Sequence, residues 1–198
     1  MTILSLNEII DIFVMTAAVG FIFKDVFRTP AKQSDDEYDP LKDYEGIKAK
    51  FDWEGLKFAM LVTAPAIILH EFGHKVFGVL FGLHGVFHAS YWGLAIGIFL
   101  KLIGSPFIFF VPAYVSYAAG GTYIQQAIIA FAGPGINLLL WLGCLVVLKS
   151  KIRITRKTRT ILHLTSQINM FLFIFNMIPI PPFDGGHFFT NIYHAFFG

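Results

Sequence analysis

Long apolar segments constrain this chain more than any other feature of its sequence. Four stretches approach or exceed the roughly 20 apolar residues that a helix needs to cross a bilayer core of about 30 Å. They are Leu6 to Phe27, Trp53 to Phe81, Tyr123 to Leu148 and Ile161 to Ile180. A mean hydropathy of +0.65 and a charged fraction of only 14% are typical of membrane proteins rather than soluble domains. We therefore expect an all-α, multi-pass integral membrane protein of about four spans, surrounded by the lipid bilayer of the cell membrane.

Charge and cysteine content exclude other classes of protein. The formal net charge of +2 is too small to indicate nucleic-acid binding, and the basic residues lie in loops. Cys144 is the single cysteine, so it can form no internal disulfide, and we expect it to pack inside a helix. The apolar run from Ile9 to Phe23 follows no basic residue and contains Asp11, which favours a retained helix over a cleaved signal peptide.

Two polar linkers separate the apolar segments. Arg28 to Asp52 mixes lysines with acidic residues and contains Pro30 and Pro40, whereas Lys149 to Arg159 is basic and contains no acidic residue. We expect one intramembrane domain over residues 1–198, with the first helix and polar loop in 1–52 and the functional core in 53–198.

The stretch from Gly85 to Gly121 is apolar but is interrupted by glycines and prolines, so it could form a helix or a re-entrant hairpin. Its part from Phe107 to Tyr117 favours a strand, because apolar residues alternate there with Pro112, Tyr114 and Ser116. Irregular backbone at membrane depth is tolerated only where protein or a water-filled cavity satisfies it. We therefore expect a partly β-hairpin segment that lines a cavity.

A metal-binding motif lies inside the second apolar segment. His70, Glu71 and His74 form the pattern HExxH, which on a helix places two imidazoles on one face with a glutamate beside them. A catalytic zinc ion usually has three protein ligands and one open position. We expect one Zn²⁺ per chain, with a third ligand from elsewhere in the sequence.

Asp184 is the candidate for the third ligand. An acidic residue inside an apolar region costs free energy unless it has a partner or a function. Asp184 follows a proline-rich bend and precedes Gly185 and Gly186, which allow close backbone approach. The alternative is that the histidines are polar residues near the headgroups and that Glu71 pairs with Lys75.

Three motifs make the chain resemble the site-2 protease family, the intramembrane zinc metalloproteases of peptidase family M50, in its compact archaeal and bacterial form without PDZ or CBS domains. The resemblance covers roughly Trp53 to the C-terminus. The motifs are HEFGH at 70–74, Ala132-Gly133-Pro134-Gly135-Ile136-Asn137, and the NxxPxPxxDGG pattern from Asn176 to Gly186.

The resemblance implies roles for individual residues. His70, His74 and Asp184 would bind zinc, and Glu71 would be the general base and acid. Asn137 would hold or polarise the substrate, although a hydrogen bond between helices is an equally good explanation of a polar residue there. Asn176 would shape the backbone before Asp184.

Three further histidines have weaker assignments. His84 and His88 are four residues apart, but no glutamate lies between them, so solvent-facing or substrate-facing positions are favoured over a second metal site. His187 could donate a hydrogen bond to a metal ligand.

The metal site also constrains the topology. His70 and His74 lie in the second half of their helix and Asp184 follows the last one, so these two helices must run in the same direction. The segment 85–121 must then enter and leave on one side, which leaves four spans. Both polar linkers would lie on the side away from the zinc. The basic linker indicates that this side is cytoplasmic, whereas the resemblance implies a site open to the cytoplasm; we adopt the latter.

The leading functional interpretation is an enzyme that cleaves peptide bonds within transmembrane segments of membrane protein substrates. The alternatives are a catalytically silent zinc-binding membrane protein and a membrane-embedded protease of soluble peptides. The intact Glu71 favours an enzyme, since a structural zinc site would not need a base. The sequence leaves the substrate and the oligomeric state open.

Overall fold

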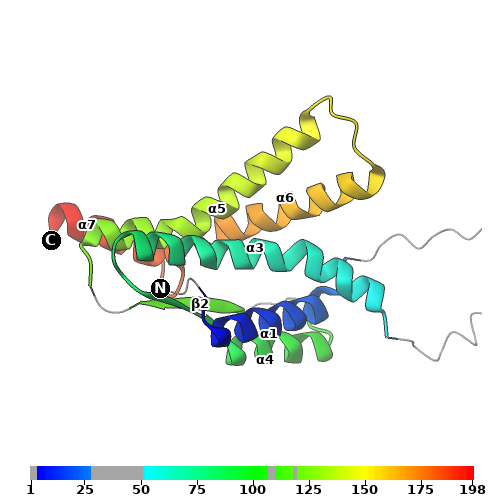
Figure 1. The fold of residues 1–198 in the computed structure, drawn as a ribbon, viewed down its shortest axis with the longest axis horizontal. Coiled ribbons are helices and arrows are strands. Elements are labelled where there is room, and N and C mark those ends of the chain that lie inside the picture. Colours follow the sequence, from blue (N-terminus) through cyan, green and yellow to red (C-terminus); the bar gives the residue numbers. More distant parts are fainter. Residues whose placement is uncertain (1–3, 28–50, 107–109, 118–119) are drawn as a thin grey trace, which may run out of the picture.

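The computed structural model describes residues 4–27, 51–106, 110–117 and 120–198. Helices account for most of this part of the chain, together with one pair of short strands (Figure 1). The helices are α1 (Leu6–Phe23), α3 (Trp53–Leu80), α4 (Tyr91–Leu102), α5 (Tyr123–Lys149), α6 (Arg156–Asn176) and α7 (Asp184–Phe197), and the strands are β1 (Gly85–Ala89) and β2 (Ala113–Tyr117).

Among the described residues, three helices are long and apolar enough to cross a membrane, namely α1, α3 and α5. They match three of the four predicted spans, and they support a multi-pass membrane protein. The fourth predicted span corresponds to α6, which begins in the basic linker at Arg156 and ends at Asn176, before Pro179. The first turns of α6 are polar, and α6 is not among the helices that are apolar enough to cross a membrane. The fourth membrane span therefore stays a prediction.

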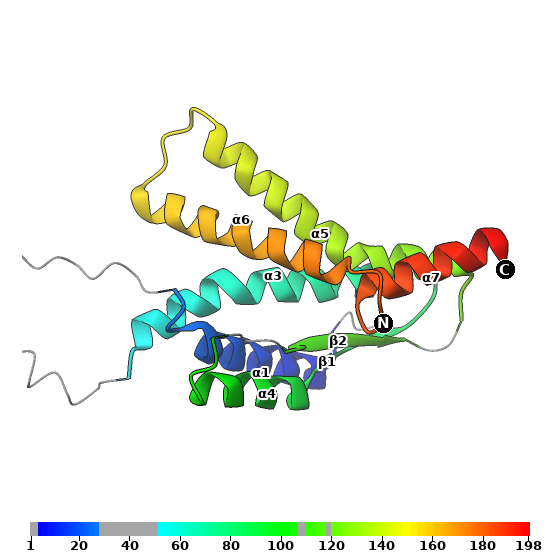
Figure 2. The ribbon, with the colours of Figure 1, turned by 180° about the vertical axis from the view of Figure 1, so that it is seen from behind.

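The helices pack in layers around α3. Helices α5 and α6 lie on one side of α3, and α1 and α4 lie on the other (Figures 1 and 2). Following the colours along the chain, α3 and α6 run in the same direction and α5 runs opposite to both. This is the arrangement expected from the metal motif. The turn at 150–155 and the described ends of the first linker lie at the end of the molecule away from α7.

The segment between α3 and α5 contains a pair of strands, as expected of a partly β-hairpin segment, and its re-entry into the membrane stays a prediction. Strands β1 and β2 pair antiparallel, with Gly85 opposite Tyr117 and Ala89 opposite Ala113. Between them the chain forms α4, which at about 1.5 Å per residue is too short to span a bilayer. The sequence left open a helix or a hairpin for this segment, and the structure contains both a helix and a pair of strands. Of the predicted strand 107–117, residues 113–117 form β2, residues 110–112 are irregular and residues 107–109 lie outside the described residues.

Helix α7 is not predicted from the sequence, which indicates only a proline-rich turn containing Asp184 after the last apolar segment. In the structure Asp184 is the first residue of this helix. Apolar side chains recur at helical spacing along it, at Phe188, Ile192 and Phe196, and α7 packs along α5. Asp184 is thereby held by a helix rather than by a free turn.

A buried ion pair joins α1 to α3. The ammonium of Lys75 pairs with Oε1 of Glu8, and both side chains are buried. The same oxygen accepts a hydrogen bond from the backbone N–H of Phe87 at 2.8 Å, and Oε2 accepts one from the N–H of Ser5 at 2.8 Å. The alternative in which Lys75 pairs with Glu71 is therefore wrong.

The apolar core next to this pair joins α1, α3 and the strands. Met15 and Val19 of α1 are fully buried against Ile67, Phe87 and Ala113. Cys144 is also buried, in α5, as expected of a packing residue.

Candidate metal centre

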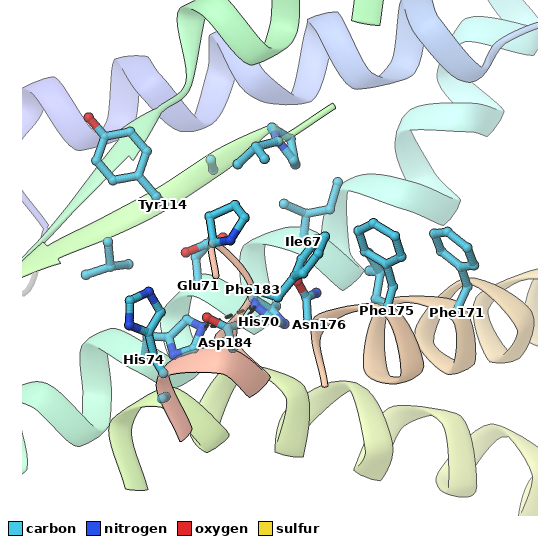
Figure 3. Close-up of a pocket in the computed structure, with 18 of the residues that line it drawn as sticks. Ile67, His70, Glu71, His74, Tyr114, Phe171, Phe175, Asn176, Phe183 and Asp184 are labelled. Atoms are coloured by element: carbon cyan, nitrogen blue, oxygen red, sulfur yellow. Dashed lines mark hydrogen bonds and ion pairs between the residues drawn. The ribbon is translucent and has the colours of Figure 1, made fainter. Parts of the chain in front are cut away.

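The three predicted metal ligands converge in the structure. Nε2 of His70 lies 3.2 Å from Nε2 of His74. Oδ2 of Asp184 lies 3.1 Å from the first of these nitrogens and 3.4 Å from the second. Figure 3 shows the three side chains pointing toward one another beneath β2. Within the described residues this is the group of histidine, cysteine and acidic side chains that could hold a metal ion.

These separations fit a tetrahedral zinc ion. With metal–ligand bonds of about 2.0 to 2.1 Å, two ligands of a tetrahedral site lie about 3.3 to 3.4 Å apart. The three separations of 3.1, 3.2 and 3.4 Å are close to the edges of one face of such a tetrahedron. A zinc ion held by these three residues would have its fourth position available for water or substrate, as in catalytic rather than structural zinc sites.

The proton positions on the imidazoles also favour a cation. Nδ1 of His70 lies 2.5 Å from Oδ1 of Asn137, and Nδ1 of His74 lies 2.7 Å from the carbonyl oxygen of Ile129. Both partners are acceptors, so both Nδ1 atoms carry the proton and both neutral rings direct the lone pair of Nε2 inward. Facing lone pairs repel one another, and a metal ion between them removes that repulsion.

A glycine lets α5 approach the two imidazoles. A Cβ atom on Gly133 would collide with the Nε2 atoms of His70 and His74. Pro134 follows it inside α5, and the helix changes direction along its length (Figures 1 and 2). The glycine-proline motif therefore brings the backbone of α5 against the metal ligands.

Asp184 owes its position to the first turn of α7. A Cβ on Gly185 would collide with the backbone of Met177, and one on Gly186 would lie 2.6 Å from the carbonyl carbon of Ile180. The close approach predicted for these glycines is confirmed. An acidic side chain at a helix N-terminus is also stabilised by the helix dipole.

Asn137 is completely buried and uses its amide entirely within the protein. Its Oδ1 accepts from His70, and its NH₂ group donates to the carbonyl of Ala66 at 3.1 Å and to Oδ1 of Asn169 at 2.9 Å. This arrangement orients an imidazole and links α3, α5 and α6. Of the two roles considered for Asn137, the contacts match the interhelical one; a direct role toward substrate stays a prediction.

Glu71 is buried and lies on the wall of a cavity of about 1060 Å³ together with the three ligands. Its carboxylate has no hydrogen-bond partner within the part of the chain that the structure describes, which leaves it available to a water molecule or a leaving group. The cavity is also lined by β2 and by aromatic side chains of α6, among them Phe171 and Phe175 (Figure 3).

The remaining candidates lie outside the ligand set. Asn176 ends α6 and lines the cavity beside Asp184 (Figure 3), and His187 also lines the cavity. Among the described hydrogen bonds, none joins the His187 ring to Asp184. His84 is exposed, and His88 contacts Oγ of Ser116 at 2.9 Å, so the described residues do not bring these two histidines into a second metal site.

Three groups around the site were not predicted from the sequence. These are Asn169, the carbonyl of Ile129 and the hydroxyl of Tyr117, which lines the cavity. A polar residue within the apolar run of α6 was a signal for Asn169. A backbone carbonyl carries no such signal.

Comparison with known proteins agrees with this geometry. Residues 142–198, which include Asp184, match the model of peptidase family M50. A protein of Methanocaldococcus jannaschii named "Putative zinc metalloprotease MJ0611" is 28% identical over 186 residues, which cover 91% of this chain and 82% of that protein. A match of this extent includes residues before Trp53, whereas the motif resemblance begins only at about Trp53. No solved structure matches the chain.

A second relative comes from Synechocystis and is named "Putative zinc metalloprotease sll0528". It is 31% identical over 138 residues, which cover 70% of this chain but only 31% of that longer protein. The family match covers the region of the third ligand, and both relatives carry metalloprotease names. These matches together support assignment of the chain to peptidase family M50, as a zinc metalloprotease.

Proposed function

We propose that this M50 metalloprotease hydrolyses peptide bonds within the transmembrane segments of membrane proteins, using one zinc ion held by His70, His74 and Asp184. The observation that carries the proposal is the position of the ligand cluster. Two of the ligands lie in the C-terminal half of α3, a helix long and apolar enough to cross the membrane, and they face a cavity with largely apolar walls. Such a cavity suits an apolar polypeptide segment.

The chemistry follows from the side chains around the ligands. When bound, zinc supplies Lewis acidity, which polarises a carbonyl group and lowers the pKa of water to about 7. The carboxylate of Glu71 takes the proton of the attacking water and passes it to the leaving amide nitrogen. Asn137 and the carbonyl of Ile129 hold the two imidazoles in the required orientation and tautomer.

A helical substrate must unwind before its carbonyl groups are accessible, and we propose that β2 holds the unwound segment. Within the described residues β2 has a partner strand on one side only, and residues 111–115 and 117 line the cavity. An extended peptide can add to such a free edge through backbone hydrogen bonds.

The register of the strand pair shows which groups are free for this purpose. The N–H of Ser90 donates to the carbonyl of Pro112 at 3.0 Å, and hydrogen-bonded pairs alternate along an antiparallel ladder. Val115 and Phe87 lie opposite each other as a non-hydrogen-bonded pair. Its N–H and C=O therefore point away from β1, toward an added strand. The N–H of Phe87 points outward in the same way, since it donates to Glu8.

We also propose that the site opens toward the cytoplasm, as the family resemblance implies, although the bases of the 149–159 linker favour the opposite orientation. In a Cys144→Ala background, Lys151→Cys in the turn at the far end of the molecule should react with a membrane-impermeant maleimide added outside intact cells. Labelling only after permeabilisation would show that this turn is cytoplasmic and that the site opens to the other side.

The function is tested with purified protein in liposomes and a single-span substrate, with and without a zinc chelator, beside Glu71→Gln. We expect cleavage by the parent, loss with chelator, and loss in the variant with zinc still bound. A soluble peptide of the same sequence forms a separate arm. Cleavage of the soluble peptide alone would support a protease of soluble peptides, and equal cleavage by the zinc-loaded variant would refute a role for Glu71 as base.

A further inference from the structure

Tyr117 is the last residue of β2, and its ring occupies a space formed by two glycines. A Cβ atom on Gly78 of α3 would collide with the Tyr117 ring, and one on Gly85 of β1 would lie 2.7 Å from the ring carbon Cε1. Larger residues at either glycine would displace the ring. The backbone is therefore shaped to hold this aromatic side chain in one place, which fixes the direction of its hydroxyl group.

The hydroxyl lacks the partner that a structural tyrosine would have. Among the described residues, its oxygen is the side-chain polar atom that is fully shielded from solvent and still lacks a hydrogen bond. Buried polar groups are nearly always paired, and an exception calls for an explanation such as a catalytic role. The side chain lines the same cavity as His70, Glu71 and His74, so the unpaired group belongs to a residue on the wall of the reaction site.

The electrostatic surroundings keep this hydroxyl a hydrogen-bond donor. Burial raises the pKa of Tyr117, and the nearby carboxylates of Glu71 and Asp184 raise it further. The phenol therefore stays protonated at any pH at which a protease of this type would work. A neutral phenol beside the metal ligands can donate a hydrogen bond to an oxygen that gains negative charge.

We propose that the Tyr117 hydroxyl donates a hydrogen bond to the carbonyl oxygen of the scissile peptide bond and stabilises the negative charge that develops there. This inference rests on the proposed function, because it assumes that a peptide lies in the cavity. The position of the residue supports it: a substrate strand paired with β2 would run along the strand that carries Tyr117. The hydroxyl group takes no part in proton transfer and forms no covalent bond.

The test uses Tyr117→Phe, which keeps the ring between the two glycines and removes only the hydroxyl. We expect kcat to fall by about 10²-fold, as for other single donors of this kind, with KM and zinc content close to those of the parent. Tyr193→Phe on the exposed side of α7 removes a hydroxyl outside the cavity and serves as the matched control. An unchanged kcat in Tyr117→Phe would overturn the proposal, as would an equal loss in the control.

A second measurement separates a catalytic donor from a structural one. A phosphonate analogue of the substrate peptide imitates the charged tetrahedral state, and its affinity should fall in Tyr117→Phe by about the same factor as kcat. Equal affinity for the parent and the variant would overturn the role of Tyr117. A parent protein that cleaves no membrane substrate, with Glu71→Gln indistinguishable from it, would instead refute the proposed function.

Discussion

Oδ1 of Asn137 lies 2.5 Å from Nδ1 of His70, and the amide nitrogen of the same residue donates to Asn169 on a third helix. This contact joins a candidate metal ligand to the packing of α3, α5 and α6. The role of Asn137 can therefore be separated by experiment into metal positioning and substrate binding.

Asn137→Ala should lower zinc affinity by about 10- to 100-fold, because it removes the acceptor that fixes the tautomer of His70. Zinc affinity is measured by competition with a chromophoric chelator. Activity should recover when zinc is added in excess. If Asn137 instead polarises the substrate, the variant will bind zinc like the parent and remain slow at saturating zinc.

Zinc should stabilise the fold, because the ligands come from α3 and α7, which lie far apart in sequence. A ligand present at about 1,000 times its Kd stabilises the native state by about 4 kcal/mol. Thermal unfolding in detergent should therefore shift upward when zinc is restored to chelated protein. Asp184→Ala should abolish most of this shift. A shift of equal size in that variant would argue against Asp184 as a ligand.

The buried pair of Glu8 and Lys75 should show strong coupling. Glu8→Gln leaves the Lys75 ammonium buried without its counter-charge, and breaking a buried pair in this way costs roughly 3 to 5 kcal/mol. The double variant Glu8→Gln, Lys75→Met should recover much of the loss, as measured by unfolding in detergent. Additive effects of the two single changes would show that the pair contributes little.

Proline at Val115 should reduce cleavage of a membrane substrate by roughly tenfold, the loss expected for one or two backbone hydrogen bonds. The N–H that it removes points away from β1, so the strand pair and the zinc content should be preserved. Val115→Ala keeps this N–H and reports the cost of the side chain alone. Cleavage by the proline variant at the parent rate would contradict substrate pairing with β2.

The sequence by itself determined the local features of this protein. Apolar runs longer than a bilayer is thick predicted α1, α3 and α5, because hydrophobic length is a property of a contiguous segment. The spacing of His70 and His74 placed both imidazoles on one helix face, because residues four apart are neighbours on a helix surface. The motif from Asn176 to Gly186 indicated Asp184 as the third candidate ligand, and the metal geometry required α3 and α6 to run in the same direction.

Only the tertiary structure decided which distant groups meet. The pairing of Lys75 with Glu8 rather than Glu71, the acceptors of Nδ1 on the two imidazoles, and the unpaired hydroxyl of Tyr117 depend on contacts between separate elements. Helix α7 begins at Asp184 because its apolar face packs on α5 and its glycines fit against the preceding turn. Such contacts arise from packing in three dimensions, which no local pattern of residues encodes.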